Sequence, residues 1–277
     1  LIFSISILVT TLVYNYFGNT FALDMPNFRK WHSDAVPQIG GLIFGILYLL
    51  LLTIFDIVPF WYLICGLITV FMGTLDDIYH LSWKIKLIIQ LFLAAYIAYV
   101  FWGLINAIAF YNYSIEISEI VLLVIFLVWF IGIYNAINLI DGIDGLAGGF
   151  SFILFLGIGI SNLGSFSQIN FIFSIIILSF LIFNQRPAKL FMGDAGSLLL
   201  GFHTAVLPLL FYDNNVGFEI LNMTPFIILT SFLIADTTRV FFTRLLAGKS
   251  PMTADTIHFH HLILQQSGSY LASIFSI

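Results

Sequence analysis

The chain has 277 residues, of which 61% are hydrophobic and only 8% are charged. Because soluble globular proteins carry about a quarter charged residues, this composition excludes a soluble domain, a disordered chain and a disulfide-rich secreted scaffold. Nine basic and fourteen acidic side chains give a net charge of −5, which leaves no basic face for a nucleic acid. The single Cys65 excludes an internal disulfide. The composition therefore predicts a polytopic membrane protein.

The apolar runs predict helices, because in lipid only helices and closed barrels satisfy all their backbone groups, and these runs lack the alternation of barrel strands. In chain order we expect spans at 1–17, 41–55, 60–75, 85–102, 119–134, 149–163, 169–184, 197–211 and 225–242, with a further span beginning near Leu262. The predicted fold is an all-α transmembrane bundle of about nine to ten helices. The sequence shows no repeat or linker, so residues 1–277 are expected to form one domain. We expect this domain to lack residues at its N-terminus and at the end of its C-terminal region.

The basic residues fall on alternate connections between these spans: Arg29, Lys30, Lys84, Lys86, Arg186, Lys189, Arg239, Arg244 and Lys249. The opposite connections carry only acids: Asp56, Glu116, Glu119, Asp213 and Glu219. By the positive-inside rule, the first residue is expected outside and the basic loops in the cytoplasm.

Six further acids lie at or near the cytoplasmic ends of the spans: Asp76, Asp77, Asp141, Asp144, Asp194 and Asp236. A carboxylate at membrane depth is costly, so such residues are candidates for a functional site. Helix capping at the interface is the alternative for each of them.

Asp76 and Asp77 end an apolar run as a pair, and two adjacent carboxylates favour a nearby cation or a raised pKa. This pattern suits a proton acceptor beside a metal or a phosphate. Asp194 lies between Gly193 and Gly196 just before another apolar run, where it is our candidate ligand for Mg²⁺.

Asn135, Asn138 and Asp141, followed by Asp144, recur every three residues and would share one face of a helix. The glycines that follow would break the helix at the membrane surface. The amides and carboxylates there are expected to bind a base or a sugar, with a solvated face as the alternative.

His258, His260 and His261 fall within four residues after the last basic loop. Imidazoles bind phosphate when protonated and metal when neutral, and a zinc site is not favoured because no cysteine accompanies them. Acids for a metal, cations for phosphate and amides for a base thus share one side of the membrane, as phosphoryl transfer requires.

The segments 73–77, 135–149, 191–197 and 258–261 together resemble, in order, those of the polyprenyl-phosphate N-acetylhexosamine-1-phosphate transferases. This superfamily, glycosyltransferase family 4, includes the phospho-MurNAc-pentapeptide translocase. The first cytoplasmic loop, Asp24 to His32 with Pro37, Gly40 and Gly41, is more similar to the GlcNAc-1-phosphate branch.

The resemblance implies that a UDP-sugar reacts with undecaprenyl phosphate to give undecaprenyl-diphospho-sugar and UMP. This would be the first membrane step of a cell-envelope polysaccharide pathway, such as O-antigen synthesis, at the cytoplasmic face of a bacterial inner membrane. It also implies Mg²⁺, with Mn²⁺ as a substitute, and suggests a homodimer. The transfer would proceed in one step or through an aspartyl intermediate.

Carried over by residue, the resemblance makes Asp194 the magnesium ligand and gives catalytic roles to Asp76, Asp77, Asp194, His260 and His261. It assigns substrate binding to Asn135, Asn138, Asp141, Asp144, Lys84, Lys86 and His258.

Other interpretations remain open. The same chemistry would serve UDP-MurNAc-pentapeptide or another UDP-N-acetylhexosamine. An ion-coupled transporter would also need intramembrane acids, but it predicts inverted repeats and acids near the bilayer midplane, which this sequence lacks. A non-catalytic homologue is expected to have lost one of the motifs, and this sequence retains them all.

Overall fold

The computed structural model describes residues 1–18, 20–25, 35–214, 219–248 and 257–267. Arg29, Lys30, Lys249, most of the first cytoplasmic loop and the side chain of Asp213 lie outside the described residues. The helices are α1 (Ile2–Phe17), α2 (Gly40–Phe55), α3 (Phe60–Tyr79), α4 (Trp83–Val100), α5 (Glu119–Ile140), α6 (Leu146–Gly159), α7 (Ser165–Asn184), α8 (Gly193–Asn214), α9 (Thr224–Leu229), α10 (Ser231–Leu246) and α11 (Phe259–Ser267). The strands are β1 (Leu23–Asp24), β2 (Val36–Pro37), β3 (Ala107–Phe110), β4 (Tyr113–Glu116) and β5 (Ile220–Asn222).

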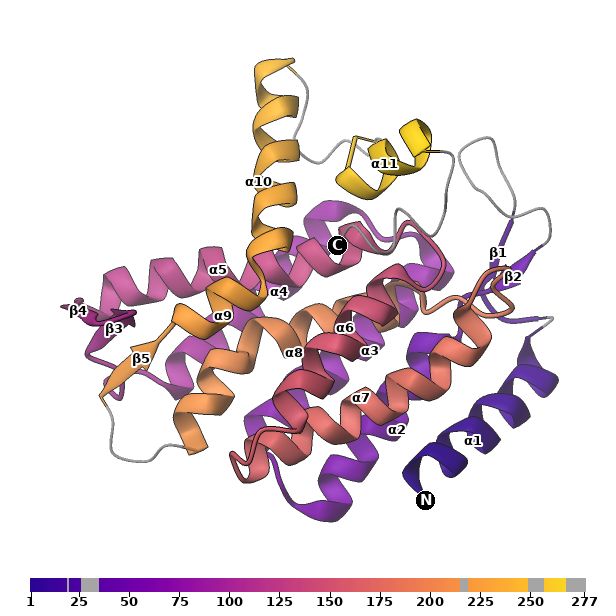
Figure 1. Cartoon of the computed structure of the whole chain (residues 1–277), viewed down its shortest axis with the longest axis horizontal. Helices are drawn as coiled ribbons and strands as arrows, with labels where there is room; N and C mark the ends of the chain where they lie inside the picture. The colour runs from indigo at the N-terminus through magenta and orange to yellow at the C-terminus, as the bar shows by residue number, and fades with distance from the viewer. Residues whose placement is uncertain (19, 26–34, 215–218, 249–256, 268–277) are drawn as a thin grey trace. The chain divides into compact units, whose positions relative to one another are not determined.

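The apolar helices confirm the prediction of an all-α polytopic membrane protein (Figure 1). Five of the described helices, α3, α4, α5, α7 and α8, are long and apolar enough to cross a membrane. Three shorter apolar helices, α1, α2 and α6, coincide with predicted spans. The side of the membrane on which each helix end lies stays a prediction.

The ninth predicted span, 225–242, is interrupted at Thr230 and forms α9 and α10. The Thr230 hydroxyl donates to the carbonyl of Phe226 at 2.7 Å, a local bond of the kind that bends helices. The last helix, expected to begin near Leu262, begins three residues earlier as α11 at Phe259, whose backbone N–H donates to Asp236 at 3.1 Å.

The described residues form two compact units. The first combines residues 1–81 and 144–200, where α7 packs against α6, α1 and α2, and α2 packs against α3. The second combines residues 82–143 and 201–277, where α5 packs against α4 and α10. A three-stranded sheet in the order β4-β3-β5, which the sequence did not predict, also belongs to the second unit. Whether the chain behaves as one domain stays a prediction.

Candidate active site

The predicted acid pair at the end of α3 is divided between two tasks. Both oxygens of Asp77 accept backbone N–H groups at the start of α8, from Asp194 at 2.7 Å and from Ala195 at 3.1 Å. Asp76 turns back and accepts the N–H of Leu81 at 2.6 Å, which fixes the turn after α3. The structure therefore brings Asp77 to the backbone of Asp194, a contact that the sequence did not predict, and gives Asp76 a bond of the capping kind.

Small residues allow this close approach. A Cβ atom on Gly73 would lie 2.4 Å from the backbone of Ala195, and one on Gly41 would lie 2.0 Å from the backbone nitrogen of Gly196. Gly193 has a φ of +63°, and a Cβ there would lie 2.5 Å from the Asp77 carboxylate. Any side chain at these positions would separate α2 or α3 from α8.

Two acidic residues, Asp77 and Asp194, come together at the first turn of α8. Asp194 lies in that turn, and the amides of Asp194 and Ala195 already hold Asp77. Among the described residues, no group of three or more His, Cys, Asp or Glu side chains is arranged to hold a metal ion by itself. Mg²⁺ usually takes one or two protein carboxylates and completes its shell with phosphates and water. The carboxylate of Asp194, with Asp77 beside it, therefore fits a Mg²⁺ site better than a structural metal site whose ligands all come from the protein.

Asp144 and the buried Asn184 organise the loop after α7. Asp144 accepts the N–H of Ala188 at 3.2 Å. Asn184 accepts the N–H of Gly145 at 2.9 Å and donates to the carbonyl of Leu190 at 2.9 Å. The sequence prediction missed Asn184, although an amide at the end of an apolar helix was the available signal. These bonds hold the loop that carries Arg186 and Lys189 beside Asp144.

In the second unit, Gln90 of α4 and Asn135 of α5 exchange two hydrogen bonds, at 3.1 and 2.8 Å. The Asn135 amide also donates to the carbonyl of Ile131 at 2.8 Å. Its two hydrogens are therefore engaged within the protein, and a substrate would have to replace one of these bonds. Gln90, 2% exposed, is a second polar residue that the sequence prediction missed.

The pairing of α4 with α5 through Gln90 and Asn135 puts the two lysines of α4 level with the end of α5 that carries Asn138 and Asp141. The β3–β4 hairpin joins the end of α4 to the start of α5, so these paired helices run in opposite directions. Lys86 lies one turn before Gln90, which places it toward Asn138. Lys84 lies nearer still to the helix end, with its ammonium 5.8 Å from the centroid of the Trp83 ring.

The histidine segment docks on α10 through Asp236. Oδ2 of Asp236 lies 2.7 Å from Nδ1 of His258. Oδ1 of Asp236 accepts hydrogen bonds from the Arg239 guanidinium at 2.8 Å and from the N–H of Phe259 at 3.1 Å. The Arg239 guanidinium also donates to the carbonyl of Ile257 at 2.6 Å. Asp236 was one of the six acids singled out in the sequence, but no role was predicted for it, and Arg239 was counted only as a loop cation.

The rings of His260 and His261 lie over Gly142, the residue after Asp141. A Cβ atom on Gly142 would lie 2.9 Å from Nε2 of His260 and 3.1 Å from Nε2 of His261. Burial, with smaller contributions from the charges of His261 and His258, lowers the pKa of His260 from 6.5 to about 3. His260 is therefore neutral at pH 7 and does not supply a positive charge for phosphate.

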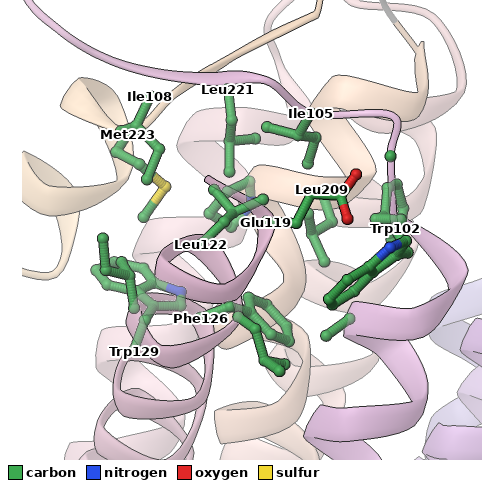
Figure 2. A pocket seen from close by; sticks show the side chains of 16 residues that line it. Trp102, Ile105, Ile108, Glu119, Leu122, Phe126, Trp129, Leu209, Leu221 and Met223 are labelled. Carbon is green, nitrogen blue, oxygen red and sulfur yellow. The ribbon is translucent and has the colours of Figure 1, made fainter. Parts of the chain in front are cut away.

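The second unit also contains an apolar pocket between α4, α5, α8 and the strands β3 and β5 (Figure 2). It is partly open, so its empty volume of about 620 Å³ includes space outside the protein, and it contains none of the predicted site residues. Trp102, Phe126 and Trp129 supply aromatic walls, and Glu119 is the one charged residue among the described residues of its lining. The pocket suits an apolar chain.

The predicted site residues thus form two groups, each within one unit. The first unit holds Asp76, Asp77, Asp144 and Asp194, and the second holds Lys84, Lys86, Asn135, Asn138, Asp141, His258, His260 and His261.

Comparison with known proteins identifies the family. The model of glycosyl transferase family 4 matches residues 59–212, more than half of the chain. The chain belongs to glycosyl transferase family 4. This match spans Asp77, the segment 135–149 and Asp194, so it confirms the resemblance drawn from the sequence motifs; the histidine segment lies beyond it.

Several relatives within this family cover nearly the whole chain. An undecaprenyl-phosphate alpha-N-acetylglucosaminyl 1-phosphate transferase of Escherichia coli (strain K12) is 34% identical over 94% of this chain and 75% of its own length. A Yersinia pestis protein of the same name is 34% identical over 88% of this chain and 69% of its own length. A Bacillus subtilis (strain 168) protein, named a probable undecaprenyl-phosphate N-acetylglucosaminyl 1-phosphate transferase, is 35% identical over 98% of this chain and 77% of its own length.

Proposed function

We propose that this family 4 member transfers GlcNAc-1-phosphate from UDP-GlcNAc to undecaprenyl phosphate. The observation that carries the proposal is the similarity to the two relatives from E. coli and B. subtilis, at 34% and 35% identity over 94% and 98% of this chain. Both are named for GlcNAc-1-phosphate transfer to this lipid. The products would be undecaprenyl-diphospho-GlcNAc and UMP.

The reaction exchanges one phosphoric anhydride bond for another. An oxygen of the lipid phosphate attacks the phosphorus that carries the sugar, and the bond from this phosphorus to the bridging oxygen breaks. UMP leaves with that oxygen. Because both reactants are anions, positioning and charge stabilisation are the main demands on the protein.

In the first unit, Asp194 would hold Mg²⁺ together with phosphate oxygens. When bound, Mg²⁺ would neutralise charge on the diphosphate. Asp77 is fixed by two backbone amides of α8 and so keeps the end of α3 against Asp194. We propose that this contact orients the end of α3 toward the phosphate. Asp76 fixes the following turn, and both acids are proposed to position the lipid phosphate.

In the second unit, Lys84 and Lys86 are proposed to attract phosphate, with Asn138 and Asp141 binding the nucleotide sugar. Gln90 and Asn135 hold α4 to α5, so they keep the lysines level with these two side chains. Neutral His260 and its neighbour His261 are proposed to donate hydrogen bonds to the diphosphate above Gly142.

The apolar pocket supports a place for part of the prenyl chain. Only 22% of the hydrophobic window of α4 and 28% of that of α5 are buried within the protein, so these helices leave much of their surface to lipid. We propose that the prenyl chain runs along α4 and α5 from the lysines toward the pocket. The reaction is proposed to occur at the cytoplasmic face of a bacterial plasma membrane.

The decisive experiment measures UMP release by the purified protein given UDP-GlcNAc, undecaprenyl phosphate and MgCl₂. Release that requires the lipid and stops with EDTA is expected. Release only with UDP-MurNAc-pentapeptide or another UDP-N-acetylhexosamine would keep the chemistry but change the donor. No release with any of these donors would contradict the proposal.

A further inference from the structure

Asp236 is a buried carboxylate to which the proposed reaction assigns no role. Its side chain is 1% exposed, and the imidazole of His258 that it contacts is 4% exposed. Its two oxygens are divided: Oδ2 faces Nδ1 of His258, whereas Oδ1 accepts Arg239 and the N–H of Phe259. One oxygen therefore fixes a ring, and the other fixes the start of α11.

The nitrogens beyond this contact are buried without a partner. Nε2 of His258 and both ring nitrogens of His260 have no hydrogen-bond partner among the described residues. The two rings are nearly parallel, with centroids 5.8 Å apart and an interplanar angle of 13°. Buried polar atoms are almost always satisfied in a working protein, so these nitrogens point to a bound polar group.

The Asp236 contact selects the tautomer of His258. An ionised carboxylate only accepts hydrogen bonds, so Nδ1 carries the proton and Nε2 keeps its lone pair in the neutral ring. Nε2 is therefore the ring nitrogen left for a substrate, and when the ring carries both protons its Nε2–H can donate to a diphosphate oxygen.

Arg239 keeps the carboxylate in this orientation. Its guanidinium binds Asp236 and the carbonyl of Ile257, and it lies 4.3 Å from the centroid of the Phe259 ring. These contacts tie α10 to the residues on both sides of His258. The ring therefore has little freedom to rotate away from Asp236.

We infer that Asp236 is a positioning residue, which holds His258 so that Nε2 faces the diphosphate of the nucleotide sugar. The inference rests on the proposed transferase function. His258 would contact the substrate, and Asp236 would act only through it. Arg239 supports the same arrangement from behind.

The substitution Asp236→Asn separates this role from folding. The side-chain carbonyl of the introduced asparagine can still accept Arg239 and the N–H of Phe259, so α11 stays docked. The amide NH₂, however, now faces Nδ1 of His258 and donates to it, which moves the ring proton to Nε2. The variant keeps the shape of the site and inverts the tautomer.

The test is a double-mutant cycle on UMP release with UDP-GlcNAc and undecaprenyl phosphate. Asp236→Asn is expected to lower kcat about 10- to 100-fold, as loss of an orienting partner of a functional histidine does, with KM for UDP-GlcNAc within about twofold. In the His258→Gln background, Asp236→Asn should change the rate less than about threefold, because the residue through which it acts is gone. Glu116→Gln, which replaces an exposed carboxylate on β4, is the matched control and should keep the wild-type rate.

Wild-type activity of Asp236→Asn, or an equal loss with and without His258, would overturn the inference. An inactive wild-type protein would instead contradict the proposed function. The ¹⁵N chemical shifts of the histidine rings in the wild-type protein then still test the positioning. The His258 signal is assigned by its loss in His258→Gln, and it must show the Nδ1–H form. An Nε2–H form would overturn it.

Discussion

Asp77 accepts a hydrogen bond from the backbone N–H of Asp194 at 2.7 Å, although 117 residues separate them in the chain. This bond joins the end of α3 to the first turn of α8. It places a fixed carboxylate beside the acid that we propose as the magnesium ligand. Two motifs that are independent in the sequence are thereby one site.

Replacing Asp194 by asparagine should remove the metal ligand and leave the packing intact. Because Asp77 binds the backbone of residue 194 and not its side chain, that bond survives the substitution. We expect UMP release to fall about 100- to 1,000-fold, the usual cost of a lost electrostatic contact in a transition state. The melting temperature in detergent should match that of the wild type; wild-type turnover would disprove the metal assignment.

Replacing Gly73 by valine should separate α3 from α8. A side chain there meets the backbone of Ala195, which cannot move aside as a flexible side chain would. We expect a loss of about 1–3 kcal/mol in the free energy of unfolding together with loss of UMP release. Gly157→Ala, where a Cβ would have nothing within 4 Å, is the control and should unfold like the wild type. Equal stability of the two variants would contradict the proposed role of Gly73.

His260 should make stability fall in mild acid. Burial, then the charges of His261 and His258, lower its pKa from 6.5 to about 3, so the folded protein keeps the ring neutral while the unfolded chain takes up a proton. This stabilisation is complete above pH 6.5 and is lost as the pH falls toward 3, by up to about 1.4 kcal/mol per pH unit. Melting curves between about pH 7.5 and 5, which bracket the ordinary histidine pKa, should show a shallower pH dependence for His260→Gln. An unchanged slope would show that His260 is not buried as a neutral ring.

Filling the apolar pocket should affect long prenyl substrates selectively. Leu122→Trp adds volume inside the lining, whereas Val124→Trp, on the exposed side of α5, is the control. We expect Leu122→Trp to raise KM for undecaprenyl phosphate about tenfold, a loss of about 1.4 kcal/mol in binding. KM for a short prenyl phosphate should not change. An equal effect on both lipids would show that the prenyl chain does not occupy the pocket.

The predicted orientation can be tested with single cysteines at Lys189 and Glu219, which are both exposed and lie on connections expected on opposite sides. The native Cys65 is buried and should not react. A membrane-impermeant thiol reagent applied to intact cells should label Glu219→Cys, and Lys189→Cys only after the membrane is opened. Labelling of both from outside would refute the positive-inside assignment.

The sequence alone determined the fold class and the family. A chain with 61% hydrophobic residues and 8% charged residues can be stable only in lipid, where the backbone must satisfy itself, so the apolar runs had to be helices. Asp77, Asn138, Asp194 and His260 could be selected because polar residues are costly there and need a function.

The tertiary structure decided which partner each polar residue has. Asp236 in the sequence is one acid among several, and only the folded chain shows that it binds His258, 22 residues later. Thr230 separates α9 from α10, with φ −105° and ψ 9° and its hydroxyl bonded to the carbonyl of Phe226, a break without a signature in hydrophobicity. Helical periodicity places a side chain on a face, but the hydrogen bonds that select a tautomer or orient a carboxylate act across elements distant in the chain, where only folding brings donor and acceptor within about 3 Å.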